Sequence, residues 1–322
     1  MRHFKPIVLI AIIAFQICIL SSCGEYETNN LPDGTIEIVK YKGYKKDVVI
    51  PTVFGEKKVT AIGESAFQEK KLTSVVIPKG ITTIGENSFS HNRLLSLIIP
   101  DTVTTIGEWA FYNNKLTSVV IPKNITTISY GAFLSNELSS VTIPYSVTII
   151  ENGAFGGNQL IKIIIPDTVT EIGSFAFEDN KLSTLIIPNS VTSIGSRAFN
   201  KNQLTDVKIS ENISIIEDEA FANNKLSTVI IPNSVTSIGR NAFAGNQLTN
   251  VKLSENINKI GVNAFSNNKL THITIPNGDA LAYNAFDDEV IIDQPKQDTI
   301  DLSELSDEER AFIEKIINTL SE

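Results

Sequence analysis

Phenylalanine recurs every 22 residues along most of this chain, and this period constrains the fold more than any other feature. Ten phenylalanines keep the spacing from Phe67 to Phe265, and Phe286 follows one residue early. Leucine lies five residues after each of the ten, and isoleucine lies five residues before each. A fixed period of roughly 20–50 residues indicates a solenoid, in which each repeat forms one coil.

The coil 116–137, LTSVVIPKNITTISYGAFLSNE, shows how one repeat predicts local structure. Val119 and Ile121 are two positions apart, so they point to the same face of a short strand. Pro122 ends that strand because its nitrogen has no hydrogen to donate to a ladder. A second short extended segment includes Ile128, and Gly-Ala-Phe then turns the corner. We therefore expect two short strands and one tight corner in each coil.

Asparagine closes the coil in nine consecutive repeats, from Asn92 to Asn268. Its side-chain amide can satisfy the backbone groups of a turn, so stacked coils predict a ladder of asparagines. A lone coil buries too little apolar surface to offset the entropy of ordering it, so the coils have to stack. Parallel strands lie about 4.8 Å apart, which predicts a stack roughly 50 Å long.

The pattern LxxVxIPxxVxxIGxxAFxxNx resembles the BspA-like leucine-rich repeat of bacterial cell-surface proteins. The resemblance covers residues 34–286, with an expected strand-rich N-terminal cap at Thr35–Lys58. It implies a β-rich solenoid of the leucine-rich-repeat type, with 22-residue coils and a parallel sheet. It also implies non-catalytic adhesion to host proteins or to other cells.

The first 22 residues are typical of a signal peptide, with a short basic start and an apolar run from Ile7 to Leu20. The run ends in Leu-Ser-Ser-Cys23, which resembles the lipobox of bacterial lipoproteins. This resemblance implies that Cys23 carries the lipid anchor and that residues 23–33 form a tether. The alternative is an ordinary signal peptide with a chance cysteine. Gly24, in place of aspartate, favours the outer membrane over inner-membrane retention.

Little in the remaining composition indicates chemistry. Cys18 and Cys23 are the two cysteines, so the body of the protein has no disulfide or thiolate metal site. Residues 24–286 hold 24 acidic and 22 basic residues, a net charge of −2, which argues against nucleic acid as a partner. His91 and His272 lie about eight coils apart. We expect no enzyme activity, no cofactor and no metal. Six lysines near the N-terminus, at 40, 42, 45, 46, 57 and 58, are a solvated cap face or an anion site.

The C-terminal residues 287–322 carry 12 acidic and 3 basic residues. Ser306 and Glu309 are spaced as a capping box, and apolar residues follow at helical spacing from Ile313 to Leu320. We expect an acidic linker and an amphipathic helix, which either packs on the last coil or hangs free.

Two groups of residues are candidates for binding. The residue between the two inward positions of LxxVxI should face outward, and it is mostly aliphatic, with Lys208 and Lys252 in the later half. This file is either a protein-binding strip or a set of good sheet-forming residues. The second group is aromatic, in positions that are polar or small in other coils. It comprises Trp109, Tyr112, Tyr130, Tyr145 and Phe175. Such residues suit a protein hot spot or a glycan, or they are isolated surface aromatics.

The ten residues IIPNSVTSIG occur twice, at 186–195 and 230–239. Residues 182–225 and 226–269 share 31 of 44 positions, so a two-coil unit has been duplicated. The repeated motif is therefore scaffold, and a binding site is expected where the coils differ. We expect a lipid-anchored, surface-exposed recognition protein whose partner is a protein or glycan on a host or neighbouring cell. The alternative is an envelope scaffold that binds a bacterial protein or glycan.

Overall fold

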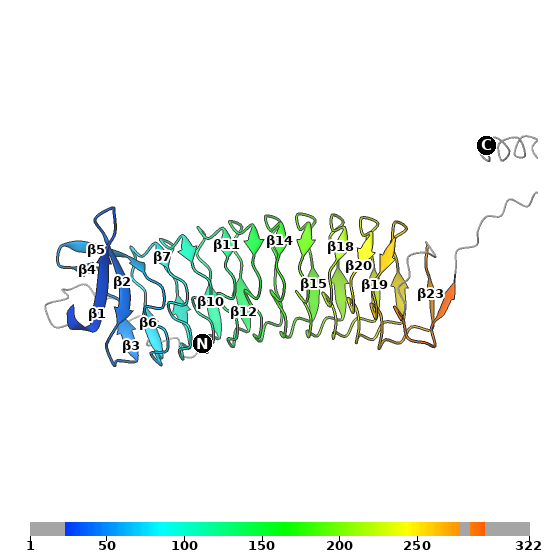
Figure 1. The fold of residues 1–322 in the computed structure, drawn as a ribbon, viewed down its shortest axis with the longest axis horizontal. Coiled ribbons are helices and arrows are strands. Elements are labelled where there is room, and N and C mark those ends of the chain that lie inside the picture. The colour runs from blue at the N-terminus through cyan, green and yellow to red at the C-terminus, as the bar shows by residue number, and fades with distance from the viewer. Residues whose placement is uncertain (1–22, 277–283, 294–322) are drawn as a thin grey trace, which may run out of the picture.

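The computed structural model describes residues 23–276 and 284–293, which form one elongated stack of coils (Figure 1). Most coils contribute one short strand to a first sheet face and another to a second face, although the segment around Ile164 follows the first face without forming a strand. The predicted solenoid with 22-residue coils and parallel pairing is confirmed. The predicted helix within 306–320 lies outside the described residues.

The strands of the first face come from the LxxVxI segments and pair in parallel wherever they are hydrogen-bonded to each other. They are β3 Asp47–Val49, β6 Ser74–Val76, β8 Leu97–Ile98, β10 Ser118–Val120, β12 Ser140–Thr142, β15 Thr184–Ile186, β17 Asp206–Lys208, β19 Thr228–Ile230, β21 Asn250–Lys252, β23 His272–Thr274 and β24 Ile291–Asp293.

The strands of the second face surround the isoleucine that precedes each corner, and they also pair in parallel. They are β5 Lys57–Ile62, β7 Thr83–Ile84, β9 Thr105–Ile106, β11 Thr127–Ile128, β13 Ile149–Ile150, β14 Glu171–Ile172, β16 Ser193–Ile194, β18 Ile215–Ile216, β20 Ser237–Ile238 and β22 Lys259–Ile260. Registers are offset by one period, as in the pair Ile128 with Ile150.

A column of stacked phenylalanine rings fills the interior. Neighbouring rings from Phe67 to Phe286 have centroids 5.0–5.7 Å apart and planes within 2–16° of parallel. Offset stacking of this kind adds to the apolar burial of each ring. Tyr41 extends the column by one ring at the N-terminal end, 5.4 Å from Phe67.

The asparagine ladder is present, and it joins each coil to the one before it. Asn136 accepts a hydrogen bond from the backbone N–H of Leu116 at 3.1 Å. Its amide donates to the carbonyl of Phe111 at 2.9 Å and to that of Phe133 at 3.2 Å. The same contacts recur in the other coils, so a buried polar side chain helps to set the spacing of the stack.

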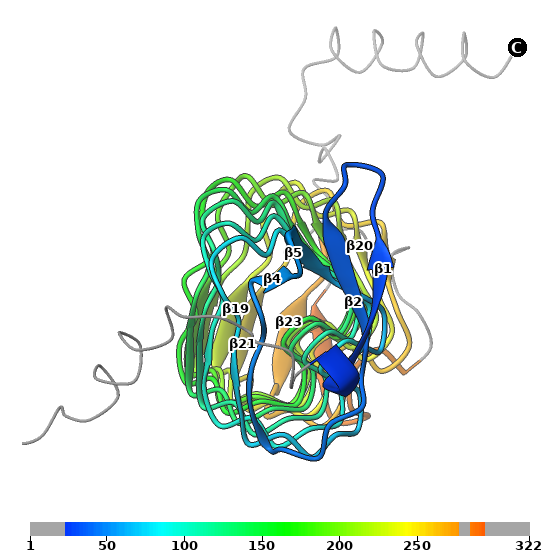
Figure 2. The same cartoon turned by 90° about the vertical axis from the view of Figure 1, so that its left-hand side faces the viewer.

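The N-terminal cap begins earlier than the sequence predicts. The 3-10 helix η2 (Cys23–Glu25) leads into β1 (Tyr26–Asn30), which pairs antiparallel with β2 (Ile36–Tyr41). β4 (Val53–Phe54) pairs antiparallel with β5. Figure 2 shows β1 and β2 lying across the end of the stack. Residues 26–30 are therefore part of the folded cap, where the sequence predicts a tether.

At the C-terminal end the described fold also passes the expected boundary at residue 286. β24 pairs in parallel with β23, in the register His272 with Ile291. The segment from 287 that the sequence assigns to an acidic linker therefore begins with residues of the last coil.

Candidate functional site

The first sheet face carries a single file of outward side chains, which we name the sheet strip. Its members are Val76, Ile98, Val120, Thr142, Ile164, Ile186, Lys208, Ile230, Lys252 and Thr274, and all are exposed. The six valines and isoleucines among them are 51–79% exposed. Water therefore contacts most of each aliphatic side chain, although the fold buries similar residues one position away.

Strand pairing brings members of the sheet strip side by side. Val120 is the register partner of both Ile98 and Thr142. In the duplicated coils, Ile186 pairs with Lys208 and Ile230 pairs with Lys252. The strip thus changes along its length from mainly aliphatic, with Thr142 among the aliphatic residues, to alternating aliphatic and cationic from Ile186 to Lys252.

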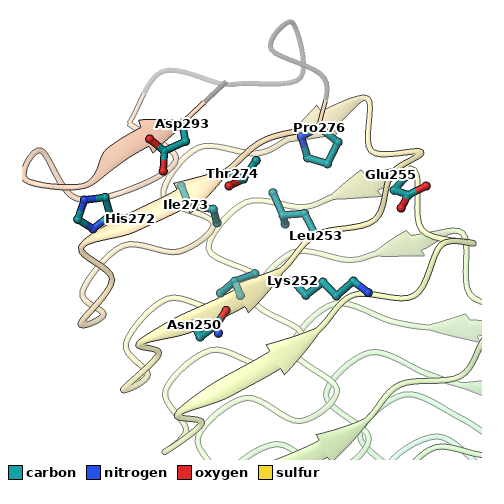
Figure 3. A pocket seen from close by; sticks show the side chains of 10 residues that line it. Asn250, Lys252, Leu253, Glu255, His272, Ile273, Thr274, Pro276 and Asp293 are labelled. Atoms are coloured by element: carbon teal, nitrogen blue, oxygen red, sulfur yellow. The ribbon is translucent and has the colours of Figure 1, made fainter. Parts of the chain in front are cut away.

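Lys208 and Lys252 form no ion pair or side-chain hydrogen bond within the described part of the chain. They lie two coils apart on the same file, so both ammonium groups are free to meet a partner. Figure 3 shows Lys252 beside a shallow pocket on the outer side of β21, β23 and β24.

That pocket has a mixed polar and aliphatic lining and lies at the C-terminal end of the strip. Around it are Asn250, Lys252, Glu255, His272, Thr274 and Asp293, together with aliphatic residues. It contains one lysine and two carboxylates, and the described residues contain no cluster of three side chains suited to a metal. The pocket provides polar and aliphatic contacts at the end of the strip.

Three of the five predicted aromatics meet in an aromatic cluster, at the corner that follows the second sheet face. The ring of Trp109 lies 5.2 Å from that of Tyr112 and 4.5 Å from that of Tyr130, edge to face in both pairs. The ring of His91 adds a fourth member, 4.9 Å from Tyr112. Asn113 donates a hydrogen bond to Nδ1 of His91 at 2.8 Å. Sequence reasoning missed His91, which lies one coil before its partners.

The corner imposes an unusual backbone on this cluster. Trp109 has φ +57°, a left-handed conformation that glycine and asparagine adopt more readily. Gly131 occupies the same position in the next coil, also with positive φ. A Cβ at Gly131 would lie 2.6 Å from the indole of Trp109, so the glycine makes the space that the ring occupies. The space above Gly131 thus accommodates the indole of Trp109, the single tryptophan of the chain.

The other two predicted aromatics lie apart from the cluster. Phe175, at the same corner position two coils beyond Gly131, is covered by the guanidinium of Arg197 at 5.7 Å from its centroid. Arg197 is itself paired with Glu219 at 2.7 Å, and this hydrogen bond raises the pKa of the guanidinium. Tyr145 follows the first sheet face, after Pro144, and is strongly exposed. Among the described residues it has no ring neighbour.

Residue 23, the predicted acylation site, lies in η2 at the N-terminal end of the stack. No helix within the described ranges is long and apolar enough to cross a membrane.

In this chain the buried positions repeat from coil to coil, whereas the outward positions differ. The fold is a leucine-rich-repeat solenoid, a class that typically serves as a scaffold for binding. This chain belongs to the family described as BspA type leucine rich repeat region, which matches residues 60–183 and 170–292. No curated protein matches the sequence.

Several solved structures resemble the fold. The pneumococcal vaccine antigen PcpA is 18% identical with a TM-score of 0.55, over 84% of this chain and 92% of that one. A leucine rich cell surface protein from Faecalibacterium prausnitzii is 25% identical with a TM-score of 0.41, over 84% of this chain and 93% of that one. A leucine-rich repeat protein from Bacteroides ovatus is 21% identical with a TM-score of 0.46, over 84% of this chain and 98% of that one. The likeness to PcpA supports the solenoid fold.

Proposed function

We propose that this protein is an exported, surface-exposed recognition protein that binds a protein partner through the sheet strip. The observation that carries the proposal is the file of six aliphatic side chains, each more than half exposed, along the first sheet face. Exposed apolar side chains gathered along one face are typical of an interaction site. The partner is a protein on a host or neighbouring cell, so the function is adhesin-like and non-catalytic.

Lipid anchoring at Cys23 is part of the same proposal, with the outer membrane as its location. Family membership supports a surface location, since a related structure is described as a cell surface protein. Loss of labelling by a radioactive fatty acid in the Cys23→Ala variant tests the anchor. Equal labelling of the variant would place the acyl group elsewhere.

The binding proposal is tested with the purified chain and variants of the strip. The variant Ile98→Ser, Ile164→Ser, Ile186→Ser removes three exposed methyl-rich side chains and leaves the core intact. A matched control replaces Ile215 and Val262, which are 45% and 42% exposed and lie off the strip, with serine. Both are assayed against extracellular-matrix proteins and envelope extract, with unfolding curves for each.

We expect the strip variant to lose at least tenfold in affinity for a captured protein, while the control binds as the wild type does. Equal binding by the wild type and the strip variant, with unchanged stability, would remove the strip as the site. Binding confined to proteins of the envelope extract would favour the scaffold alternative.

Glycan binding at the aromatic cluster is a second candidate. The observation that favours it is the indole of Trp109, held over Gly131 despite a left-handed backbone. Aromatic rings at a surface suit the apolar faces of sugars as well as protein hot spots. Glycan binding is supported if added glycans shift the fluorescence emission of Trp109 in the wild type and leave it unchanged in the Tyr130→Ala variant. Emission unaffected by every glycan tried would exclude it.

A further inference from the structure

The fold begins almost directly at the proposed acylation site. η2 takes up Cys23–Glu25, and Tyr26 is already buried, with its ring 5.2 Å from that of Tyr41 and 5.8 Å from that of Phe54. Three residues span at most roughly 10 Å even when extended. An acyl group at residue 23 would therefore hold the cap itself against a bilayer, with no tether between them.

One loop of the cap lies beside that residue. It has the sequence KGYKK, residues 42–46, and we name it the KGYKK loop. The backbone N–H of Lys42 donates to the carbonyl of Glu25 at 2.7 Å, and the ammonium of Lys45 lies 3.3 Å from the Glu25 carboxylate. These contacts fix the loop to η2 at the N-terminal end of the stack, the end that faces the viewer in Figure 2.

The KGYKK loop presents the side chains that proteins place at membrane interfaces. Tyr44 is 92% exposed, more than any other large hydrophobic residue among those described. Lys45 and Lys46 follow it and are also exposed. Tyrosine is enriched at the level of the lipid headgroups, and lysine extends its ammonium to phosphate while its stem stays on apolar surface.

The local charge also favours an anionic surface. Lys40, Lys42, Lys45 and Lys46 stand against Glu25, Glu27 and Asp47 in this part of the cap, four positive charges against three negative. The Lys46 ammonium donates a hydrogen bond to the carbonyl of Lys70 at 2.8 Å. Lys42 is paired with Glu27 and Lys45 with Glu25. These pairs are exposed, and exposed pairs contribute little to stability. The ammonium groups can therefore turn to headgroup phosphates at small cost, whereas most of the stack is close to neutral.

We propose that the KGYKK loop docks on the anionic headgroups of the bilayer in which the Cys23 acyl chains lie. This inference rests on the proposed acylation of Cys23 and goes beyond it, because it assigns a membrane-facing surface. The cap then faces the membrane, and the stack carries the sheet strip away from it.

The test attaches one acyl chain chemically, so it does not depend on acylation in the cell. Residues 23–322 contain a single cysteine, which reacts with N-dodecylmaleimide to give a uniformly lipidated chain. One chain of this length binds vesicles weakly and reversibly, so the contribution of the loop is measurable as a change in partitioning. Co-sedimentation is measured with phosphatidylcholine vesicles, with and without 30% phosphatidylglycerol.

Two loop variants are tested: the double variant Lys45→Gln, Lys46→Gln, and the single variant Tyr44→Ser. The control is a double variant that removes the same charge as the loop double variant. The control is Lys225→Gln with Lys269→Gln, two exposed lysines in coils far from the cap. We expect the loop double variant to partition at least tenfold less on phosphatidylglycerol vesicles, Tyr44→Ser to partition several-fold less, and the control to change less than twofold.

Equal losses in the loop and control variants would overturn the proposal, since they would show a non-specific effect of net charge. So would a loop effect of the same size on pure phosphatidylcholine. Because the acyl chain is added chemically, these outcomes are independent of whether Cys23 is acylated in the cell.

Discussion

Replacing Asn136 with alanine tests what holds neighbouring coils together. The Asn136 side chain is buried and reaches four backbone groups in two coils, of which the carbonyl of Leu134, at 3.4 Å, is the most distant. Its removal leaves the N–H of Leu116 with no partner. The carbonyls of Phe111 and Phe133 each keep one donor, from Asn114 at 3.2 Å and Asn158 at 3.0 Å.

The cost follows from these contacts. A buried N–H without a partner costs about 1–3 kcal/mol, and each lost hydrogen bond to a carbonyl that keeps another donor costs about 0.5–1 kcal/mol. We therefore expect Asn136→Ala to lower the free energy of unfolding by about 2–5 kcal/mol, measured by urea denaturation followed by circular dichroism. Solenoids can unfold in segments, so amide hydrogen exchange in coils 94–115 and 116–137 locates the loss.

Asn268→Ala is the matched control, since this asparagine makes the same contacts at the end of the ladder but is only partly buried. Water can replace its bonds, so we expect less than half the loss. If the two variants cost the same, or if Asn136→Ala costs less than about 1 kcal/mol, the ladder does not contribute to stability as the geometry indicates.

Three further predictions concern single positions. Ser88 has a buried hydroxyl without a partner, where most other coils have alanine, so Ser88→Ala should raise the free energy of unfolding by about 1 kcal/mol, and a lower urea midpoint would refute this. Gly131→Ala places a methyl group against the Trp109 indole on a left-handed backbone. We expect destabilisation by about 1–3 kcal/mol and a red-shifted tryptophan emission, whereas unchanged emission would contradict the packing. Hydrogen bonds from Ser74 and Thr73 lower the pKa of the Asp47 carboxyl. The stability that this carboxylate contributes is present at neutral pH and is lost as pH falls through its folded-state pKa, so the urea midpoint of Asp47→Asn should change less between pH 6 and pH 3 than that of the wild type.

The repeated parts of the fold could be predicted because each one depends on residues within a coil and its identical neighbours. The phenylalanine column and the asparagine ladder follow from the 22-residue spacing alone. The first cap strand could not be predicted in this way. Its sequence, YETNN, is rich in residues that are rare in strands, and it is a strand because it pairs with β2 and buries Tyr26.

In the candidate site, too, some features could be predicted from the repeat and others depend on contacts between particular residues. That the sheet strip faces outward followed from alternation along each strand. The aromatic cluster depends instead on how the corner directs side chains from one coil to the next. Trp109 and Tyr130 differ by 21 residues, and their rings meet because Gly131 leaves room for the indole. Phe175 shares the corner position of Trp109, but there Arg197 covers its ring.

Because the fold begins at residue 23, the proposed acylation of Cys23 would fix the height of the sheet strip above a membrane. With the cap held at a membrane, successive members of the sheet strip would lie at increasing heights above it, about 4.8 Å per coil. A partner on another cell would then meet Ile186 and Ile230 before Val76, so the duplicated coils with Lys208 and Lys252 would lie in the outer half of the strip.

Photo-crosslinking from the sheet strip tests the central claim most directly. A benzophenone amino acid is placed singly at Ile98, Ile186 and, as an off-strip control, Ile215, in the purified chain bound to a captured partner. We predict covalent adducts with the partner from positions 98 and 186 and none from 215. Adducts from position 215 alone, or from none of the three in a complex that still forms, would contradict recognition through the strip.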